Sequence, residues 1–239
     1  MTWLARTGPA AAPIAVGETA SLQAAGRLRC AGCFLGAALL AAQVPADGQP
    51  PRVFYSKSFP GSVPAYVEIR VERDGKAEYK EAPNDDQPVR FQLKTGDADE
   101  IFALVEKLDR FRRPLESGLK VANMGLKTFR VDGPSEKSEV QFNYSQDLDA
   151  LGLHDWFEKM TETVGHRILL ERAVRYDRLG VNKILLHLQV TVEKNRLTAG
   201  DQLLPMLDRI AKNESFLNMA RERAAALAEW IRNPKPKEE

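Results

Sequence analysis

Cysteine is almost absent from this 239-residue sequence, which contains two, Cys30 and Cys33. The chain after residue 33 therefore has neither a disulfide framework nor a cysteine nucleophile. A Cys-x-x-Cys pair suggests a redox site where it follows a strand in a βαβ unit, and no strand pattern precedes this one. The stability of the folded part must come from a hydrophobic core, which a chain of this length can bury.

The sequence also lacks an excess of charge of either sign. It has 34 Lys and Arg against 33 Asp and Glu, a formal net charge of +1. Proteins that bind nucleic acid neutralise a run of phosphates with clustered positive charge. We therefore expect no nucleic-acid partner.

Short catalytic motifs are missing as well. The sequence has no Gly-x-Ser-x-Gly elbow, phosphate-binding or dinucleotide-binding glycine loop, His-Glu-x-x-His or EF-hand pattern. No catalytic residue and no cofactor are predicted on these grounds. Acid or base catalysis by scattered carboxylates stays open, because a sequence does not show which of them meet in space.

No apolar run reaches the ~20 residues that a membrane-spanning helix needs. The 13-residue run from Cys30 to Ala42 instead has the length of a signal-peptide core, with Arg27 and Arg29 before it and Ala46-Asp47-Gly48 after it. We predict cleavage near Gly48, export to the periplasm or the exterior, and contact with the membrane only during export.

Residues 1–24 lie upstream of those arginines and show neither a helix nor a strand period. We therefore interpret residues 1–48 as a mis-started extension followed by a signal peptide, with the true start at Val16, Leu22 or Leu28.

Residues 49–146 have the alternation of β-strands. Residues 66–73 and 76–81 flank Asp74-Gly75, a hairpin turn pair, and a strand over 89–93 follows. A helix is expected over 98–112, with Asp97 and Glu100 as a capping box, and a second strand pair over 126–131 and 139–144. The prediction is an α+β fold with a mainly antiparallel sheet, in the order βββαββ, packed on a helix. A short strand at 53–55 precedes it.

Apolar residues recur with a period of 3.6 over residues 147–233. Breaks at 198–200 and 212–214 divide this region, for which we predict a C-terminal bundle of about four helices. Pro205 is expected in the first turn of its helix. Residues 234–239 are charged, contain proline and are predicted to be a disordered tail.

Four candidate metal ligands recur every fourth residue in the first of these helices. Histidine and carboxylate side chains on one helical stripe can bind a divalent ion, but such a stripe is also the usual solvated face of an amphipathic helix. These candidates are His154, Glu158, Glu162 and His166.

Two further groups are candidates for binding. One combines arginines with an aromatic and an acid near a helix junction and could hold an anionic group; the alternative is an ion-paired corner in which the arginines pair with Glu171 and Asp177. The other is a pair of tyrosines beside the first hairpin, which either line a groove or simply pack. The candidates are Arg172, Arg175, Tyr176, Asp177 and Arg178 in the first group, and Tyr55 and Tyr66 in the second.

Residues 64–111 resemble a small bacterial exported domain of unknown function, about a fifth of this chain. The matching features are Pro64-Ala65-Tyr66, Asp74-Gly75, Tyr79 and a helix with Leu and Phe anchors. Val63 stands where that family often has a cysteine. The resemblance implies export and the hairpin, and it carries no activity.

Together these features favour a non-enzymatic extracytoplasmic module that binds a protein or a cell-envelope component, with the sheet as a platform. The alternative is a metal-dependent or carboxylate hydrolase that uses Glu158, Glu162 and His166. A third hypothesis, a structural homo-oligomer, depends on exposure of Phe216 and Trp230.

Overall fold

The computed structural model describes residues 51–133 and 137–234, all of which belong to one compact unit, Pro45–Glu239. The expected leader with its two cysteines, the expected translation start and the tail beyond residue 234 lie outside the described residues.

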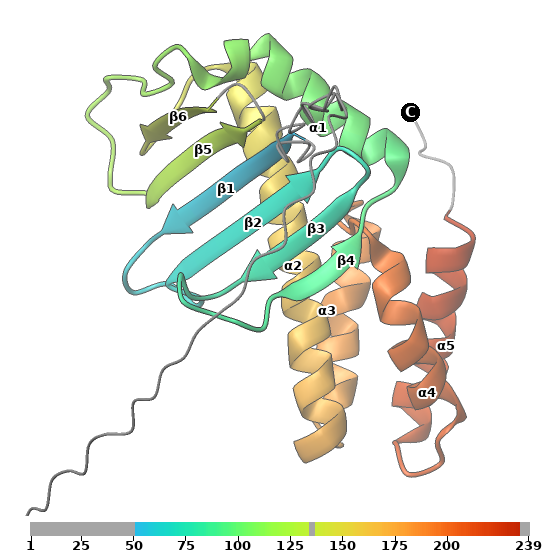
Figure 1. The fold of residues 1–239 in the computed structure, drawn as a ribbon. Helices are drawn as coiled ribbons and strands as arrows, with labels where there is room; N and C mark the ends of the chain where they lie inside the picture. Colours follow the sequence, from blue (N-terminus) through green and yellow to red (C-terminus); the bar gives the residue numbers. More distant parts are fainter. Residues whose placement is uncertain (1–50, 134–136, 235–239) are drawn as a thin grey trace, which may run out of the picture. The chain divides into compact units, whose positions relative to one another are not determined.

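Six strands form a single antiparallel sheet in the order β4-β3-β2-β1-β5-β6 (Figure 1). Their bounds are β1 Arg52–Ser58, β2 Tyr66–Glu72, β3 Lys76–Lys80, β4 Val89–Gln92, β5 Leu126–Asp132 and β6 Lys137–Phe142. With the helices described below, this confirms the predicted α+β class.

One more full strand precedes the first helix than the predicted order contains. Residues 52–58 form a seven-residue strand in the middle of the sheet, paired with both β2 and β5. Its apolar segment is short and Ser56, Lys57 and Ser58 are polar, so the sequence pattern marked only the buried part, Val53 to Tyr55.

The β2 to β3 hairpin turns at Asp74-Gly75 as predicted. Gly75 has a φ of +84°, a backbone conformation that favours glycine, and the Lys76 amide donates to Asp74 Oδ1 at 3.0 Å. The register pairs Ile69 with Tyr79, so both side chains point into the core.

Five α-helices follow or interrupt these strands. They are α1 Thr95–Lys107, α2 Leu148–Tyr176, α3 Val181–Glu193, α4 Leu204–Lys212 and α5 Asn218–Arg232. The four C-terminal helices match the predicted bundle, and Pro205 lies in the first turn of α4.

Helix α1 differs from its prediction at both ends. It begins at Thr95 without a side-chain cap, so Asp97 and Glu100 do not form the expected capping box. It ends before 112 because Asp109, Arg110 and Phe111 all adopt positive φ angles, which turn the Phe111 side chain into the core, where it is 2% exposed.

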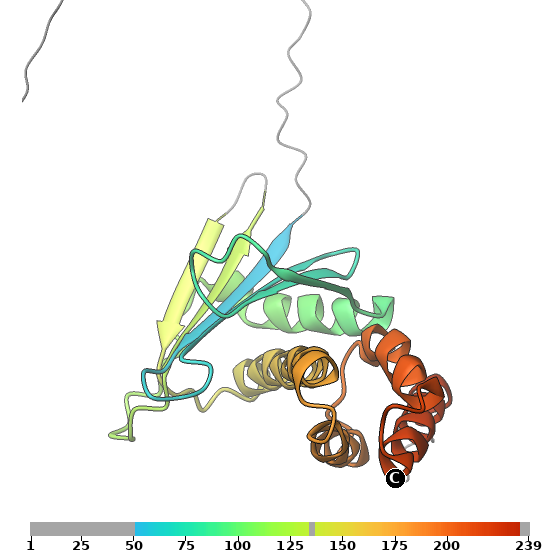
Figure 2. The same ribbon diagram turned by 90° about the horizontal axis from the view of Figure 1, so that it is seen from below.

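Helices α1 and α2 cover one face of the sheet (Figure 2). Ile101 and Val105 of α1 and Phe157 of α2 pack there against inward-pointing residues of the strands. Tyr55 stacks on Phe157 with ring centroids 4.6 Å apart, and Phe129 lies 5.9 Å from Phe157. No helix of the described ranges lies on the other face.

Helix α2 belongs to two hydrophobic cores. Its first half, through Val164, packs under the sheet, whereas Leu170 and Ala173 near its end pack with α3, α4 and α5. The 29-residue helix therefore connects the sheet and the helical bundle. Among the described helices, none is both long enough and apolar enough to cross a bilayer.

Candidate functional site

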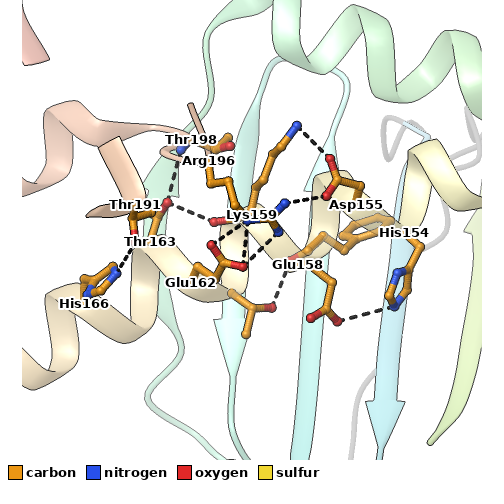
Figure 3. A network of polar contacts seen from close by, with 12 residues as sticks. His154, Asp155, Glu158, Lys159, Glu162, Thr163, His166, Thr191, Arg196 and Thr198 are labelled. Carbon is orange, nitrogen blue, oxygen red and sulfur yellow. Dashed lines mark hydrogen bonds and ion pairs between the residues drawn. The ribbon is translucent and has the colours of Figure 1, made fainter. Parts of the chain in front are cut away.

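The four candidate ligands on α2 separate into three places. The helix turns every 3.6 residues, so side chains four apart drift around its axis. His154 and Glu158 lie toward the sheet, Glu162 faces the chain that follows α3, and His166 faces α3 (Figure 3).

Glu158 lies at the centre of a half-buried polar cluster between α2 and β1. Its Oε1 accepts hydrogen bonds from Lys57 Nζ at 3.0 Å and from the Tyr55 hydroxyl at 3.2 Å. His154 Nε2 lies 3.4 Å from the same oxygen. Tyr55 is fully buried, so it is a core residue that supports this cluster and does not line an open groove.

The electrostatics of this cluster favour a neutral histidine beside an ionised glutamate. Burial, the largest effect, lowers the pKa of His154 to about 4, and the nearby positive charges of Lys127 and Lys57 act in the same direction. Burial works to raise the pKa of Glu158, but its neighbours, first the hydrogen bond and charge of Lys57 and then the hydrogen bond of Tyr55, together lower this pKa. Burial next to Glu158 raises the pKa of the Tyr55 hydroxyl.

Glu162 belongs to a separate network of ion pairs centred on Arg196. Arg196 Nε lies 2.9 Å from both carboxylate oxygens of Glu162, and its Nη1 lies 2.8 Å from Asp155 Oδ1. Lys159 Nζ completes the network at 2.7 Å from Asp155 Oδ2 (Figure 3). These contacts join α2 to the connection between α3 and α4.

Three threonines take part in further contacts of α2 with α3 and with the chain that follows it. The Thr198 amide donates to Thr163 Oγ1 at 3.1 Å, and His166 Nε2 lies 2.8 Å from Thr191 Oγ1 on α3. Burial lowers the pKa of His166. His166 and Glu162 thus hold helices together and do not converge with His154 and Glu158.

A cleft opens beside the Arg196 network, with a volume of about 530 Å³. It is bounded by α1, α2, the connection from residue 195 to 201, and the end of α5. We call it the tryptophan cleft, because Trp156 of α2 and Trp230 of α5 both line it. Asn195 and Ala199, at its edge, both have a φ of 53°, so the connection turns sharply around the opening.

The tryptophan cleft carries charges of both signs on its wall: Lys94, Asp97, Glu100, Asp155, Lys159 and Asp201. Lys159 Nζ lies 5.3 Å from the ring centre of Trp156. Burial, reinforced by Glu100 and opposed by Lys94, raises the pKa of Asp97. An aromatic and mixed-charge lining of this kind can hold a polar segment with some apolar content.

Sequence reasoning missed the tryptophan cleft. Its wall comes from residues between 94 and 234 that share no motif, and the only local signal was the presence of two tryptophans in amphipathic helices. Their proximity depends on how α5 packs against α3.

Tyr66 lies on the opposite face of the sheet from Tyr55. It pairs with Ser58, and its hydroxyl donates to Glu68 Oε2 at 2.8 Å. Burial, together with Glu68, raises the pKa of Tyr66 to about 12. The two tyrosines therefore do not share a groove.

On this helix-free face of the sheet, basic and acidic side chains lie next to each other on neighbouring strands. Across the strands, Arg90, Glu78, Arg70, Phe54, Arg130 and Glu139 form one row. Arg130 lies 3.9 Å from the centre of the Phe54 ring, which is 7% exposed as a result. A shallow groove of about 440 Å³ follows β2, β3 and β4.

The arginine-rich segment lies at the end of α2, away from both the cleft and the tyrosines. Asp177 Oδ1 accepts from the Gly180 amide at 3.0 Å. Glu171 pairs with Arg167, not with the arginines as the ion-paired corner required. Within the part of the chain that is described, the side chains of Arg172, Arg175 and Arg178 have no hydrogen-bond or ion-pair partner.

The exposure expected of Phe216 is wrong: it is 5% exposed and packs in the core of the helical bundle. Trp230 is partly buried against the same core. The two residues therefore do not present a joint apolar surface for self-association.

Residues 51–133 and 137–234 contain no group of three or more His, Cys, Asp or Glu side chains arranged to hold a metal ion. No model of a known protein family matches this sequence, and no curated protein matches it significantly.

Proposed function

We propose that this chain is a non-enzymatic extracytoplasmic binding module that holds a segment of a partner protein or cell-envelope component in the tryptophan cleft. The observation that carries the proposal is that Trp156 and Trp230, from two different helices, both line one cleft. Tryptophan is enriched among the residues that dominate binding energy at protein interfaces.

Binding is favoured over catalysis because three carboxylates in the first half of α2 are already paired with other side chains. Asp155 and Glu162 are held by Arg196, and Glu158 is held by Lys57 and Tyr55. The hydrolase alternative needs Glu158, Glu162 and His166 to act on one substrate. Each of these three side chains contacts a different partner.

Export is part of the proposal, supported by the order of arginines, apolar run and small residues between 27 and 48. The expected result of N-terminal sequencing on protein recovered from its own cells is a first residue near 49. A chain that retains residue 1 in the cytoplasmic fraction would contradict it.

The cleft is tested by capture from an envelope extract with the full chain, tagged at its C-terminus. Trp156→Ala and Trp230→Ala are compared with Leu148→Ala, an 83% exposed apolar residue that does not line the cleft. We expect wild type and Leu148→Ala to retain the same component. Each tryptophan variant should weaken its retention roughly 30-fold, as for a binding hot spot.

Thermal unfolding of each variant shows whether the fold is kept. If both tryptophan variants retain the component to the same extent as wild type, the proposal is wrong. A component recovered in cleaved form would favour the hydrolase alternative.

A further inference from the structure

The end of the helical bundle combines exposed apolar side chains with unpaired positive charge. Figure 1 shows the α2 to α3 turn and the α4 to α5 turn at the same lower end of the helices. Asn182 joins them, since its Nδ2 lies 3.4 Å from Met219 Sδ and its Oδ1 accepts a hydrogen bond from Arg223. We call this surface the basic tip, defined by Arg172, Arg175, Tyr176, Arg178, Leu179, Lys183, Leu217 and Met219.

The apolar members of the basic tip are unusually open to solvent. Tyr176 is 82% exposed, Leu179 74%, Met219 59% and Leu217 48%. Single exposed apolar residues are common, but a group of them at one end of the helical bundle indicates a contact surface.

The positive charge of the tip is not used within the fold. Arg172, Arg175, Arg178 and Lys183 are exposed, and none has a side-chain partner among the residues described. Elsewhere arginine is commonly paired, as in Arg130 with Asp132 at 3.0 Å and Arg232 with Asp208 at 2.6 Å. Asp177 is the one acidic residue between 172 and 183.

We propose that the basic tip docks on a bilayer that contains anionic lipid. The arginines and Lys183 would lie at the level of the lipid phosphates, each favoured by the negative surface potential. Tyr176 suits the headgroup region, where an aromatic ring with a hydroxyl is partly apolar and partly wet. Leu179 and Met219 would reach the boundary of the acyl chains.

The apolar residues favour lipid over nucleic acid. A nucleic-acid backbone offers phosphates but nothing that gains from burying Leu179 and Leu217, and the chain's net charge of +1 is small for such a partner. An anionic bilayer satisfies both the charge and the apolar side chains.

This inference goes beyond the proposed function, does not depend on it, and replaces the expectation that the chain contacts the membrane only during export. The tip lies where α3 and α5 begin, whereas the tryptophan cleft lies where these helices end. A 13-residue helix such as α3 is ~20 Å long. A chain docked by its tip would leave the cleft accessible.

The test is co-sedimentation of the full chain with two kinds of vesicle, phosphatidylcholine alone and an equal mixture of phosphatidylcholine and phosphatidylglycerol. The tip variant is Arg172→Gln with Arg175→Gln and Arg178→Gln. The control variant removes three positive charges elsewhere, with Lys76→Gln, Arg90→Gln and Lys107→Gln, all on side chains more than 60% exposed.

We expect the tip variant to bind mixed vesicles on the order of a hundredfold more weakly than wild type, from about 1 kcal/mol per lost charge. The control should bind as wild type does, and high salt should weaken wild-type binding. Leu179→Ser should weaken binding several-fold and leave its salt dependence unchanged.

Any contribution of residues 1–48 to vesicle binding is common to all variants, so the comparison isolates the tip. Equal binding of wild type and the tip variant to mixed vesicles would overturn the proposal. Wild-type binding to duplex DNA with none to mixed vesicles would also overturn it, in favour of a nucleic-acid surface.

Discussion

Arg196 forms an ion pair with Glu162, which lies 34 residues earlier in the sequence, and its Nε is 2.9 Å from both carboxylate oxygens. The pair fixes the start of the α3 to α4 connection against the middle of α2, the helix shared by both hydrophobic cores. It also sets one wall of the tryptophan cleft, because Asn195 and Leu197, the neighbours of Arg196, line that cleft.

We expect removal of this pair to destabilise the chain measurably. A double-mutant cycle with Glu162→Gln and Arg196→Met should give a coupling energy of about 1 kcal/mol, at the upper end for partly exposed pairs, because the geometry is two-pronged and Asp155 shares the guanidinium. Urea unfolding monitored by circular dichroism measures it.

The matched control is Asp208 with Arg232, an exposed pair near the chain end. Its cycle should give less than about 0.5 kcal/mol. A coupling at Glu162 no larger than at Asp208 would mean that Arg196 does not fix the connection.

Stability should depend on pH through His154. Burial lowers the pKa of this imidazole to about 4 in the folded chain, against about 6.5 when unfolded. Between these values the unfolded chain binds more protons than the folded chain. The contribution of His154, at most about 3 kcal/mol, is therefore complete above pH ~6.5 and is lost as the pH falls toward 4.

His154→Gln removes this titration, so the plot of unfolding free energy against pH should be flatter between 4 and 6.5 than for wild type. An unchanged slope in His154→Gln would contradict the neutral histidine described above.

The buried aromatic rings around Tyr55 and Phe157 should contribute a large part of the stability of the sheet core. Phe157→Ala removes a fully buried ring stacked on Tyr55, and we expect a loss of about 3–5 kcal/mol of unfolding free energy. Tyr55→Phe keeps the ring and removes only the hydrogen bond to Glu158, at a cost of about 1 kcal/mol.

Tyr176→Phe makes the same chemical change at an exposed position, where no loss is expected. Chemical denaturation of the three variants decides the matter. A Tyr55→Phe variant as stable as Tyr176→Phe would show that the buried hydroxyl contributes nothing.

Two glycines should respond in opposite ways to alanine. A Cβ at Gly75 would lie 2.8 Å from Leu93 O, on a backbone with a φ of +84°, so Gly75→Ala should destabilise by more than 1 kcal/mol. Gly165, within α2, has open space around it, so Gly165→Ala should stabilise by up to about 1 kcal/mol. Thermal unfolding tests both, and a destabilised Gly165→Ala would contradict this account of α2.

The sequence alone determined the α+β class, the Asp74-Gly75 hairpin and the four C-terminal helices, because these depend on local periodicity and turn chemistry. It underestimated β1, whose polar residues interrupt the alternation. It also overextended α1, because nothing local marks the three positive φ angles that end the helix.

Tertiary structure alone decided the site. Glu162 meets Arg196 only when α3 has packed against α2. Trp156 and Trp230 line one cleft only when α5 has packed as well. The sequence gives no local signal for either of these long-range arrangements. The same packing left Arg172, Arg175 and Arg178 without partners, although acids stand beside them in sequence. Side chains on a helix meet when they are three or four positions apart. Glu171 is four positions from both Arg167 and Arg175, and it pairs with Arg167.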